Sequence, residues 1–316
     1  MMEIDVKEVL VLGSTGYVGS RLVPGLINQG YIVRAGWRTR SKLEAQPWKD
    51  HPKVKPVEVD VFNTDELREA IAGSDVVYYL IHSMYSGKDF KEMDRIAASN
   101  TASISEEHNV ERIIYLSGLG EEEDNLSKHL RSRKEVDRIL RSGKTPVTTF
   151  QAAMIIGPGS ASFEIMRHLV ERLPVMITPR WVRTKTQPIS IEDTVLYLVK
   201  CLEKSEMIGE TFDIGGPEIT TYHDLMRMYA KEAGIRRRMV VPIPLLTPRL
   251  SSYWVSLITP IKASIAIPLI EGLSQETICS ENRIREIIPQ KLLTIGESIH
   301  LTLSYIQYSR ERNQAK

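Results

Sequence analysis

The sequence has few of the features that mark several large classes of protein. It contains only two cysteines, Cys201 and Cys279, which are too far apart for a metal-binding or redox motif. No apolar run approaches the roughly 20 residues that a membrane-spanning helix needs. Residues 1–5 are acidic rather than basic and apolar, unlike a signal peptide. We therefore expect reduced thiols, no metal site and a cytoplasmic location.

The sequence also has no strong excess of charge. A formal net charge of +1 argues against nucleic acid or an anionic membrane as a charge-driven partner. The apolar fraction of 42% is ordinary for a globular protein, and 316 residues suffice for one large α/β domain or a domain with a small lobe. We expect a small-molecule partner, and the oligomeric state stays open.

A glycine-rich turn near the start of the chain is the strongest local motif. The apolar run at residues 9–12 stops at Gly13, and a helical pattern begins near Gly16. Gly13 permits a tight turn, Gly16 lets backbone approach a phosphate, and Gly19 lets the helix pack on the strand. The N–H groups at the helix start then face a pyrophosphate. The alternative is a turn without a ligand.

Strands and helices alternate along the first half of the chain. After residues 9–12 the patterns predict strands at 31–37, 54–59, 75–80, 112–116 and 146–151, and helices at 63–72, 88–108 and 126–140. Pro24 predicts a kink in the first helix, and Asn63 with Glu66 has capping-box spacing. Helical connections of this length impose parallel pairing and right-handed crossovers. We expect an α/β fold with a Rossmann doubly wound parallel sheet.

The alternation ends after residue 156. We expect residues 1–156 to form the NAD(P)-binding Rossmann core. Residues 157–316 would supply the remaining Rossmann elements, a helix before residue 202 and a strand at 211–214, interleaved with a smaller, mostly helical C-terminal substrate lobe.

The stretch Gly-Ser-Thr-Gly-Tyr-Val-Gly at residues 13–19 resembles the short-chain dehydrogenase/reductase superfamily. Its spacing is similar to that of the extended and atypical branches, which include NmrA-like proteins, sugar-nucleotide epimerases and the nucleotide-binding accessory subunit of respiratory complex I. The resemblance covers roughly residues 8–235. It implies an NAD(P) cofactor bound along the carboxyl ends of the strands.

The end of the second strand predicts which dinucleotide binds. An NAD-preferring site places an acidic residue there, whereas this sequence has Arg38, Arg40 and Lys42. A guanidinium can hold a 2′-phosphate bidentately, so Arg38 favours NADP(H) over NAD(H). In NmrA-like sequences an arginine at this place has that role. The alternative is a solvated basic loop.

The resemblance assigns further cofactor contacts. It places Asp60 and Val61 against the adenine, and Leu80, Ile81 and His82 beside the adenosine ribose. His82 would be a residue of the pocket rim or a purely structural histidine. Together with Arg38, the expected cofactor-binding set includes the loop residues Gly13, Ser14, Thr15, Gly16, Tyr17, Val18 and Gly19.

The expected catalytic residues depart from the pattern of the superfamily, which uses a Ser and a Tyr–Lys pair four residues apart. Ser117 matches the Ser, but His129 stands at the Tyr place and Arg133 at the Lys place. A positioned His129 would donate a proton near neutral pH, or it would be an ordinary surface residue. Arg133 would hydrogen-bond ribose hydroxyls without moving protons.

The stretch 239–270 is strongly apolar, broken by prolines and preceded by three arginines. One interpretation is a lid over an apolar substrate cleft. The other is a lipid-facing surface that makes peripheral contact with a membrane. Either favours an apolar substrate over a sugar nucleotide.

These patterns predict an NADP(H)-dependent oxidoreductase for an apolar carbonyl, enone or quinone-like substrate. The alternative is a non-catalytic NADP(H)-binding redox sensor or assembly factor, which the missing Tyr and Lys favour. A sugar-nucleotide epimerase ranks third because that chemistry also needs the Tyr and Lys.

Overall fold

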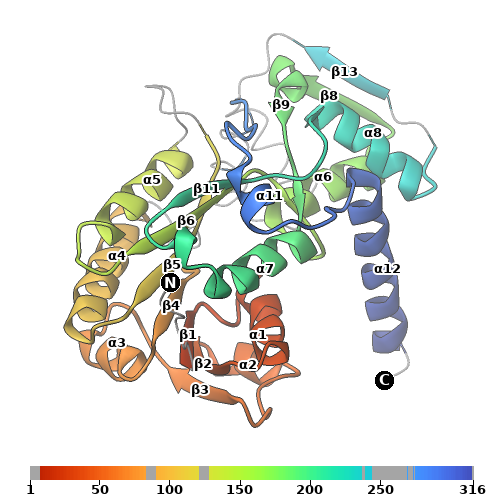
Figure 1. Ribbon diagram of the computed structural model, residues 1–316. Helices are drawn as coiled ribbons and strands as arrows, with labels where there is room; N and C mark the ends of the chain where they lie inside the picture. Colours follow the sequence, from red (N-terminus) through yellow and green to blue (C-terminus); the bar gives the residue numbers. More distant parts are fainter. Residues whose placement is uncertain are drawn as a thin grey trace.

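A seven-stranded parallel sheet forms the centre of the protein (Figure 1). The computed structural model describes residues 8–82, 90–120, 128–236, 239–243, 269, 273 and 275–314. The strands are β1 (Glu8–Leu12), β2 (Ile32–Trp37), β3 (Val54–Glu58), β4 (Val76–Tyr79), β5 (Arg112–Gly118), β6 (Val147–Ala152) and β11 (Thr211–Ile214).

The order of the strands confirms the doubly wound fold. Across the sheet they run β11-β6-β5-β4-β1-β2-β3, and all six neighbouring pairs are parallel. The chain moves outward to β3 and then returns to place β4 on the other side of β1. This reversal beside β1 is the topological switch point, where ligands bind in sheets of this kind.

Helices cover both faces of the sheet. The side chains of β1 alternate between two cores, Val9 and Val11 in one and Leu10 and Leu12 in the other, and all four are fully buried. The first core includes side chains of α1 (Gly19–Asn28) and α7 (Ile191–Lys200). The second includes α3 (Thr64–Ile71), α4 (Phe90–Glu107) and α5 (Lys128–Leu140). The short α2 (Arg40–Glu44) follows β2.

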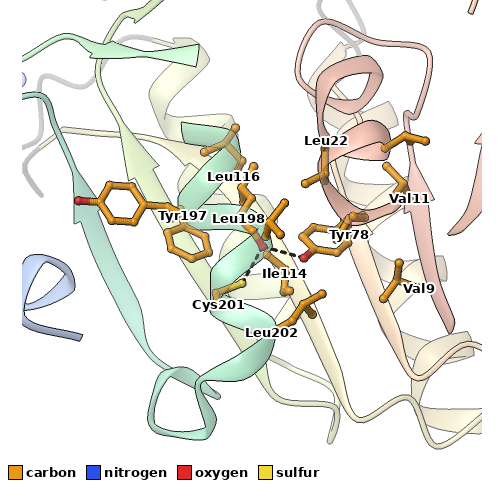
Figure 2. Packing of buried hydrophobic residues seen from close by; sticks show 14 of the residues in the cluster. Val9, Val11, Leu22, Tyr78, Ile114, Leu116, Tyr197, Leu198, Cys201 and Leu202 are labelled. Atoms are coloured by element: carbon orange, nitrogen blue, oxygen red, sulfur yellow. Dashed lines mark hydrogen bonds between the residues drawn. The ribbon is translucent and has the colours of Figure 1, made fainter. Parts of the chain in front are cut away.

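The end of α7 is fixed against β4 (Figure 2). The Leu198 carbonyl accepts a hydrogen bond from the Tyr78 hydroxyl at 2.7 Å and one from the Cys201 thiol at 3.0 Å. Burial raises the pKa of the Cys201 thiol to about 11, so it stays protonated at neutral pH. A phenol and a thiol are thus buried in the first core with their donors satisfied.

Helix α1 differs from its prediction at its start. It begins at Gly19 rather than near Gly16, because the turn that starts at Gly13 takes up the intervening residues. Pro24 lies inside the helix and has no N–H to donate to the Ser20 carbonyl. The Trp48 indole N–H donates to that carbonyl at 3.1 Å instead. Trp48 thereby supplies the hydrogen bond that Pro24 removes from the helix.

The second half of the chain divides between the sheet and a separate lobe. This lobe contains α6 (Ala161–Arg172), α8 (Tyr222–Glu232) and α12 (Ile295–Gln314), which share a third core. A parallel pair, β8 (Val175–Pro179) with β13 (Met239–Ile243), adds strand content that the sequence patterns did not predict. Shorter elements are β7 (Ile155–Ile156), β9 (Lys185–Thr186), β10 (Ile189–Ser190), β12 (Thr220–Thr221), α11 (Arg283–Ile287) and the 3-10 turns Arg180–Arg183, Cys201–Glu203 and Ser205–Met207.

Most of the apolar stretch 239–270 lies outside the described residues, so its role as a lid or a membrane contact stays a prediction. Within the part of the chain that is described, no helix is long and apolar enough to cross a bilayer.

Candidate cofactor and active site

The glycine loop has the close contacts that require glycine. Gly13 has a positive φ of 86°, and a Cβ there would lie 2.9 Å from the Leu80 carbonyl oxygen. A Cβ on Gly19 would lie 2.2 Å from the Gly13 oxygen, so only glycine lets α1 begin this close to β1. Gly16 is exposed, and its N–H donates to the Gly13 oxygen at 2.9 Å. The loop therefore leaves its Gly16 side open to a ligand.

Backbone donors remain at the start of α1. The N–H groups of Tyr17 and Val18 make no hydrogen bond to any residue of the described part. Both residues line a cavity, and Val18 is the N-cap of α1. These N–H donors and the positive end of the α1 dipole favour an anion such as a pyrophosphate at this point. Ser14 is different, because it is buried and its hydroxyl donates to the Gly36 oxygen at 2.8 Å. Its side chain holds the loop to β2 and does not face the cavity.

Two cavities meet over the glycine loop. One of about 220 Å³ lies toward β2 and β3, and one of about 300 Å³ lies toward β5 and β6. Gly13, Gly16 and Leu80 line both, so the two are neighbouring parts of one groove at the switch point. A groove divided by a phosphate-binding loop fits a dinucleotide, with one nucleoside on each side.

Cations line the cavity toward β2. Arg38, Thr39 and Lys42 contribute to its wall, along with Thr15. Arg38 and Lys42 are exposed, and no acidic residue follows β2 until Glu44. Arg40 is not in the wall, and its guanidinium lies 3.8 Å from the Glu44 carboxylate. The sequence placed three cations here, and the structure brings two of them to the groove.

The segment after β3 closes the same cavity. Asp60, Val61 and Phe62 line it, and Asp60 accepts a hydrogen bond from the Phe62 N–H at 3.1 Å. The predicted cap of α3 holds this segment, because the Glu66 carboxylate accepts from the Asp60 N–H at 2.8 Å. The Asn63 side chain accepts from the Glu66 N–H at 3.4 Å, which confirms the capping interaction.

Leu80, Ile81 and His82 line the cavity at the end of β4, and their contact with an adenosine ribose stays a prediction. The His82 Nδ1 atom lies 3.3 Å from a carboxylate oxygen of Asp94, which also accepts from the Ser132 hydroxyl at 3.0 Å. Burial, and then the nearby Arg133 charge, lower the pKa of His82 to about 4 against the opposing effect of Asp94. His82 is therefore neutral at pH 7, and it both lines the groove and fastens β4 to α4.

The structure brings Ser117 and Arg133 together at the other cavity. Ser117 is 4% exposed, lines the cavity, and its Oγ has no hydrogen-bond partner among the described residues. Arg133 Nη1 donates to the Leu116 oxygen at 2.7 Å, and its buried Nε also has no described partner. Both side chains line this cavity and therefore offer polar atoms to a ligand there.

His129 lies in α5, about one turn before Arg133, but its side chain is outside the described residues. Its role as the proton donor therefore stays a prediction. The spacing to Arg133 follows from the helix, which places residues four apart on one face.

Several cavity residues had no signal in the sequence. Tyr222 at the start of α8 and Thr277 line the 300 Å³ cavity together with Ser160, the N-cap of α6, and Ser162 in its first turn. Burial raises the pKa of Tyr222, and hydrogen bonds to Thr186 and Thr277 offset part of that rise. These residues come from segments far apart in the chain, so only the tertiary structure shows them at the site.

An arginine holds the loop after β7 against the glycine loop. Arg21 donates to the Tyr17 oxygen and to the Pro158 oxygen, both at 2.6 Å, and its guanidinium lies 4.6 Å from the centroid of the Tyr17 ring. This contact places Ser160 and Tyr17 at one side of the cavity.

Comparison with known proteins agrees with this geometry. Residues 13–165 match a family described as NAD(P)H-binding. The chain is 27% identical over 243 residues to the mitochondrial NADH-ubiquinone oxidoreductase 40 kDa subunit of Neurospora crassa. The match covers 75% of this chain and 64% of the fungal protein. The chain is also 24% identical to the mitochondrial NADH dehydrogenase [ubiquinone] 1 alpha subcomplex subunit 9 of Arabidopsis thaliana. That match covers 89% of this chain and 74% of the plant protein.

The family match gives the chain an NAD(P)H-binding domain, and these relatives support its resemblance to the atypical short-chain dehydrogenase/reductases. The fold of the chain is similar to that of an NADPH-dependent quinone oxidoreductase of Escherichia coli, solved with NADPH. The TM-score is 0.74 at 16% identity, over 93% of this chain and 99% of the other. The chain thus has an NAD(P)H-binding domain with an oxidoreductase-like fold.

Proposed function

We propose that this chain is an NADP(H)-dependent oxidoreductase that acts on an apolar carbonyl, enone or quinone-like substrate. The observation that carries the proposal is the wall of the cavity toward β2, where Arg38 and Lys42 stand and β2 ends without a carboxylate. The 2′-phosphate of NADP(H) is an anion that the side chains of Arg38 and Lys42 can bind, whereas NAD(H) has an uncharged 2′-hydroxyl at that place.

The other cavity supports the chemistry. A bound nicotinamide would exchange a hydride with the substrate. Ser117 would donate a hydrogen bond to the reacting oxygen, and Arg133 would hold the ribose of the cofactor. A guanidinium stays protonated in proteins, so Arg133 binds without moving protons. His129, at the place of the usual Tyr, is the proposed proton donor.

The lining of the cavity supports an apolar substrate. Leu119, Leu130, Met154 and Ile155 line it, and Arg133 is the single charged side chain among its described lining residues. A sugar nucleotide would need further cations for its own diphosphate. The Escherichia coli relative by fold is called a quinone oxidoreductase, and a Cucumis sativus relative at 24% identity is called divinyl chlorophyllide a 8-vinyl-reductase. Both names fit reduction of a largely apolar molecule.

A second candidate is a non-catalytic NADP(H)-binding protein, a redox sensor or assembly factor with peripheral membrane contact through residues 239–270. His129 and Arg133 in place of the Tyr–Lys pair favour it. The relatives named as subunits of NADH-ubiquinone oxidoreductase and NADH dehydrogenase also favour it.

Cofactor consumption separates the two candidates. NADPH oxidation is followed against a panel of quinones, enones and aldehydes, beside a fluorescence titration of NADPH. We expect turnover that Ser117→Ala and His129→Ala lower without loss of NADPH affinity, and weaker NADPH binding in Arg133→Ala. Tight NADPH binding without turnover across the panel would contradict the enzyme and support the second candidate.

A further inference from the structure

The C-terminal helix α12 packs on the lobe with only its first half. Ile295 and Ile299 are buried in the third core, and Thr302 is 3% exposed. From residue 304 to residue 312 every residue is exposed except the half-buried Ile306. In Figure 1 this part of α12, in dark blue, extends away from the lobe toward the C-terminus. A helical end with so few contacts is marginal in water by itself, so a packing partner would stabilise it.

The outer face of α12 is unusually apolar for exposed surface. Among the described residues six large apolar side chains are well exposed, and three of them are Leu301, Tyr305 and Tyr308 of this helix. Their exposed fractions are 43%, 65% and 63%. Spacings of four and three residues place the three side chains on one face. The face is continued by exposed Glu297 at one end and exposed Arg312 at the other.

The order of residues on this face is complementary to itself. Glu297 precedes the midpoint between residues 304 and 305 by the same number of positions as Arg312 follows it. Leu301 and Tyr308 are also equally distant from that midpoint, and Tyr305 lies beside it. If two copies pack antiparallel with a two-fold axis there, Glu297 of one copy meets Arg312 of the other, and Leu301 meets Tyr308. Tyrosines from both copies meet at the axis.

We propose that the α12 stripe (Glu297, Leu301, Tyr305, Tyr308 and Arg312) is the contact surface of a homodimer in which two copies of α12 pack antiparallel. An interface in which the same patch faces itself is what two-fold symmetry requires. A parallel pair would place Glu297 against Glu297 and Arg312 against Arg312, and like charges oppose it. The Glu297 carboxylate is held at the start of α12, because its Oε2 accepts from the Thr294 N–H and hydroxyl, both at 2.7 Å.

The dimer should be weak and reversible. A 20-residue helix is about 30 Å long, and one face of it buries less surface than a typical stable interface. Sedimentation equilibrium of the full chain, from low micromolar to near-millimolar concentration, measures the dissociation constant. We expect a monomer–dimer equilibrium. Tyr305→Asp should raise the dissociation constant at least tenfold, and Gln307→Asp, on a different face of the same turn, should leave it within about twofold.

Charge reversal tests the antiparallel register. Glu297→Arg alone sets arginine against arginine, and Arg312→Glu alone sets glutamate against glutamate, so each should be monomeric. In an equimolar mixture of the two variants both contacts are again between opposite charges, and a heterodimer should form. An NADPH titration of each variant checks folding, because the stripe is not part of either cavity. A monomer at every concentration would overturn the proposal, and so would a dimer indifferent to Tyr305→Asp or a mixture that stays monomeric.

Discussion

Removal of the Arg38 guanidinium should weaken NADPH binding and leave NADH binding nearly unchanged. Arg38 is in the wall of the cavity toward β2, and the two cofactors differ there by one phosphate. A hydrogen bond to a charged group contributes about 1.5–3 kcal/mol, which corresponds to roughly a 10- to 150-fold change in dissociation constant.

The exposure of Arg38 places the expected loss at the lower end of that range. Water and salt screen a charge contact at the surface, so Arg38→Ala should weaken NADPH binding about tenfold. Lys42 lines the same cavity and should retain part of the attraction. The variant that lacks both side chains should therefore lose more affinity than Arg38→Ala, and the preference for NADPH should shrink as salt rises.

Fluorescence titration with NADPH and NADH provides the measurement. Arg40→Ala is the matched control, because Arg40 is two residues away, exposed, and directed to Glu44 instead of the cavity. Its dissociation constants should stay within about twofold of the parent values. If Arg38→Ala weakened the binding of NADPH and NADH equally, or if Arg40→Ala had the same effect as Arg38→Ala, the assignment of the phosphate site would be wrong.

Four other changes test separate parts of the structure. Gly16→Val should abolish NADPH binding with an unchanged circular dichroism spectrum, because a side chain would occupy the open side of the loop. Ser117→Ala should lower turnover roughly 10²-fold in steady-state assays, with NADPH affinity retained. Trp48→Phe should lower the free energy of unfolding in urea by about 1–3 kcal/mol, and adding Pro24→Ala should recover part of that loss by restoring a helical donor. The pKa of His82 is lowered by burial from 6.5 to about 4, so protonation favours the unfolded chain. Stability should fall by up to about 3 kcal/mol as pH drops through that window, and His82→Gln should remove this part of the fall.

Local patterns in the sequence determined the Rossmann half of the protein. The run before Gly13, the three glycines and the alternation of strands and helices depend on neighbours within a few residues, and the structure confirms the parallel sheet. The cations after β2 and the cap at Asn63 could be predicted for the same reason. The predicted start of α1 was wrong by three residues, because the turn at Gly13, and not the spacing of apolar residues, fixes where the helix begins.

Contacts between distant segments were decided by the tertiary structure alone. Trp48 donates across 28 residues to the carbonyl that Pro24 leaves without a donor, and β13 pairs with β8 across more than 60 residues. Tyr222 and Thr277 come from segments far apart in the sequence, and both line the cavity of Ser117. The sequence specifies such contacts only through packing of the whole chain, because no local pattern records which distant side chain fills a given space. The glycine loop is different, since its turn is set by steric limits that act on each residue of the backbone.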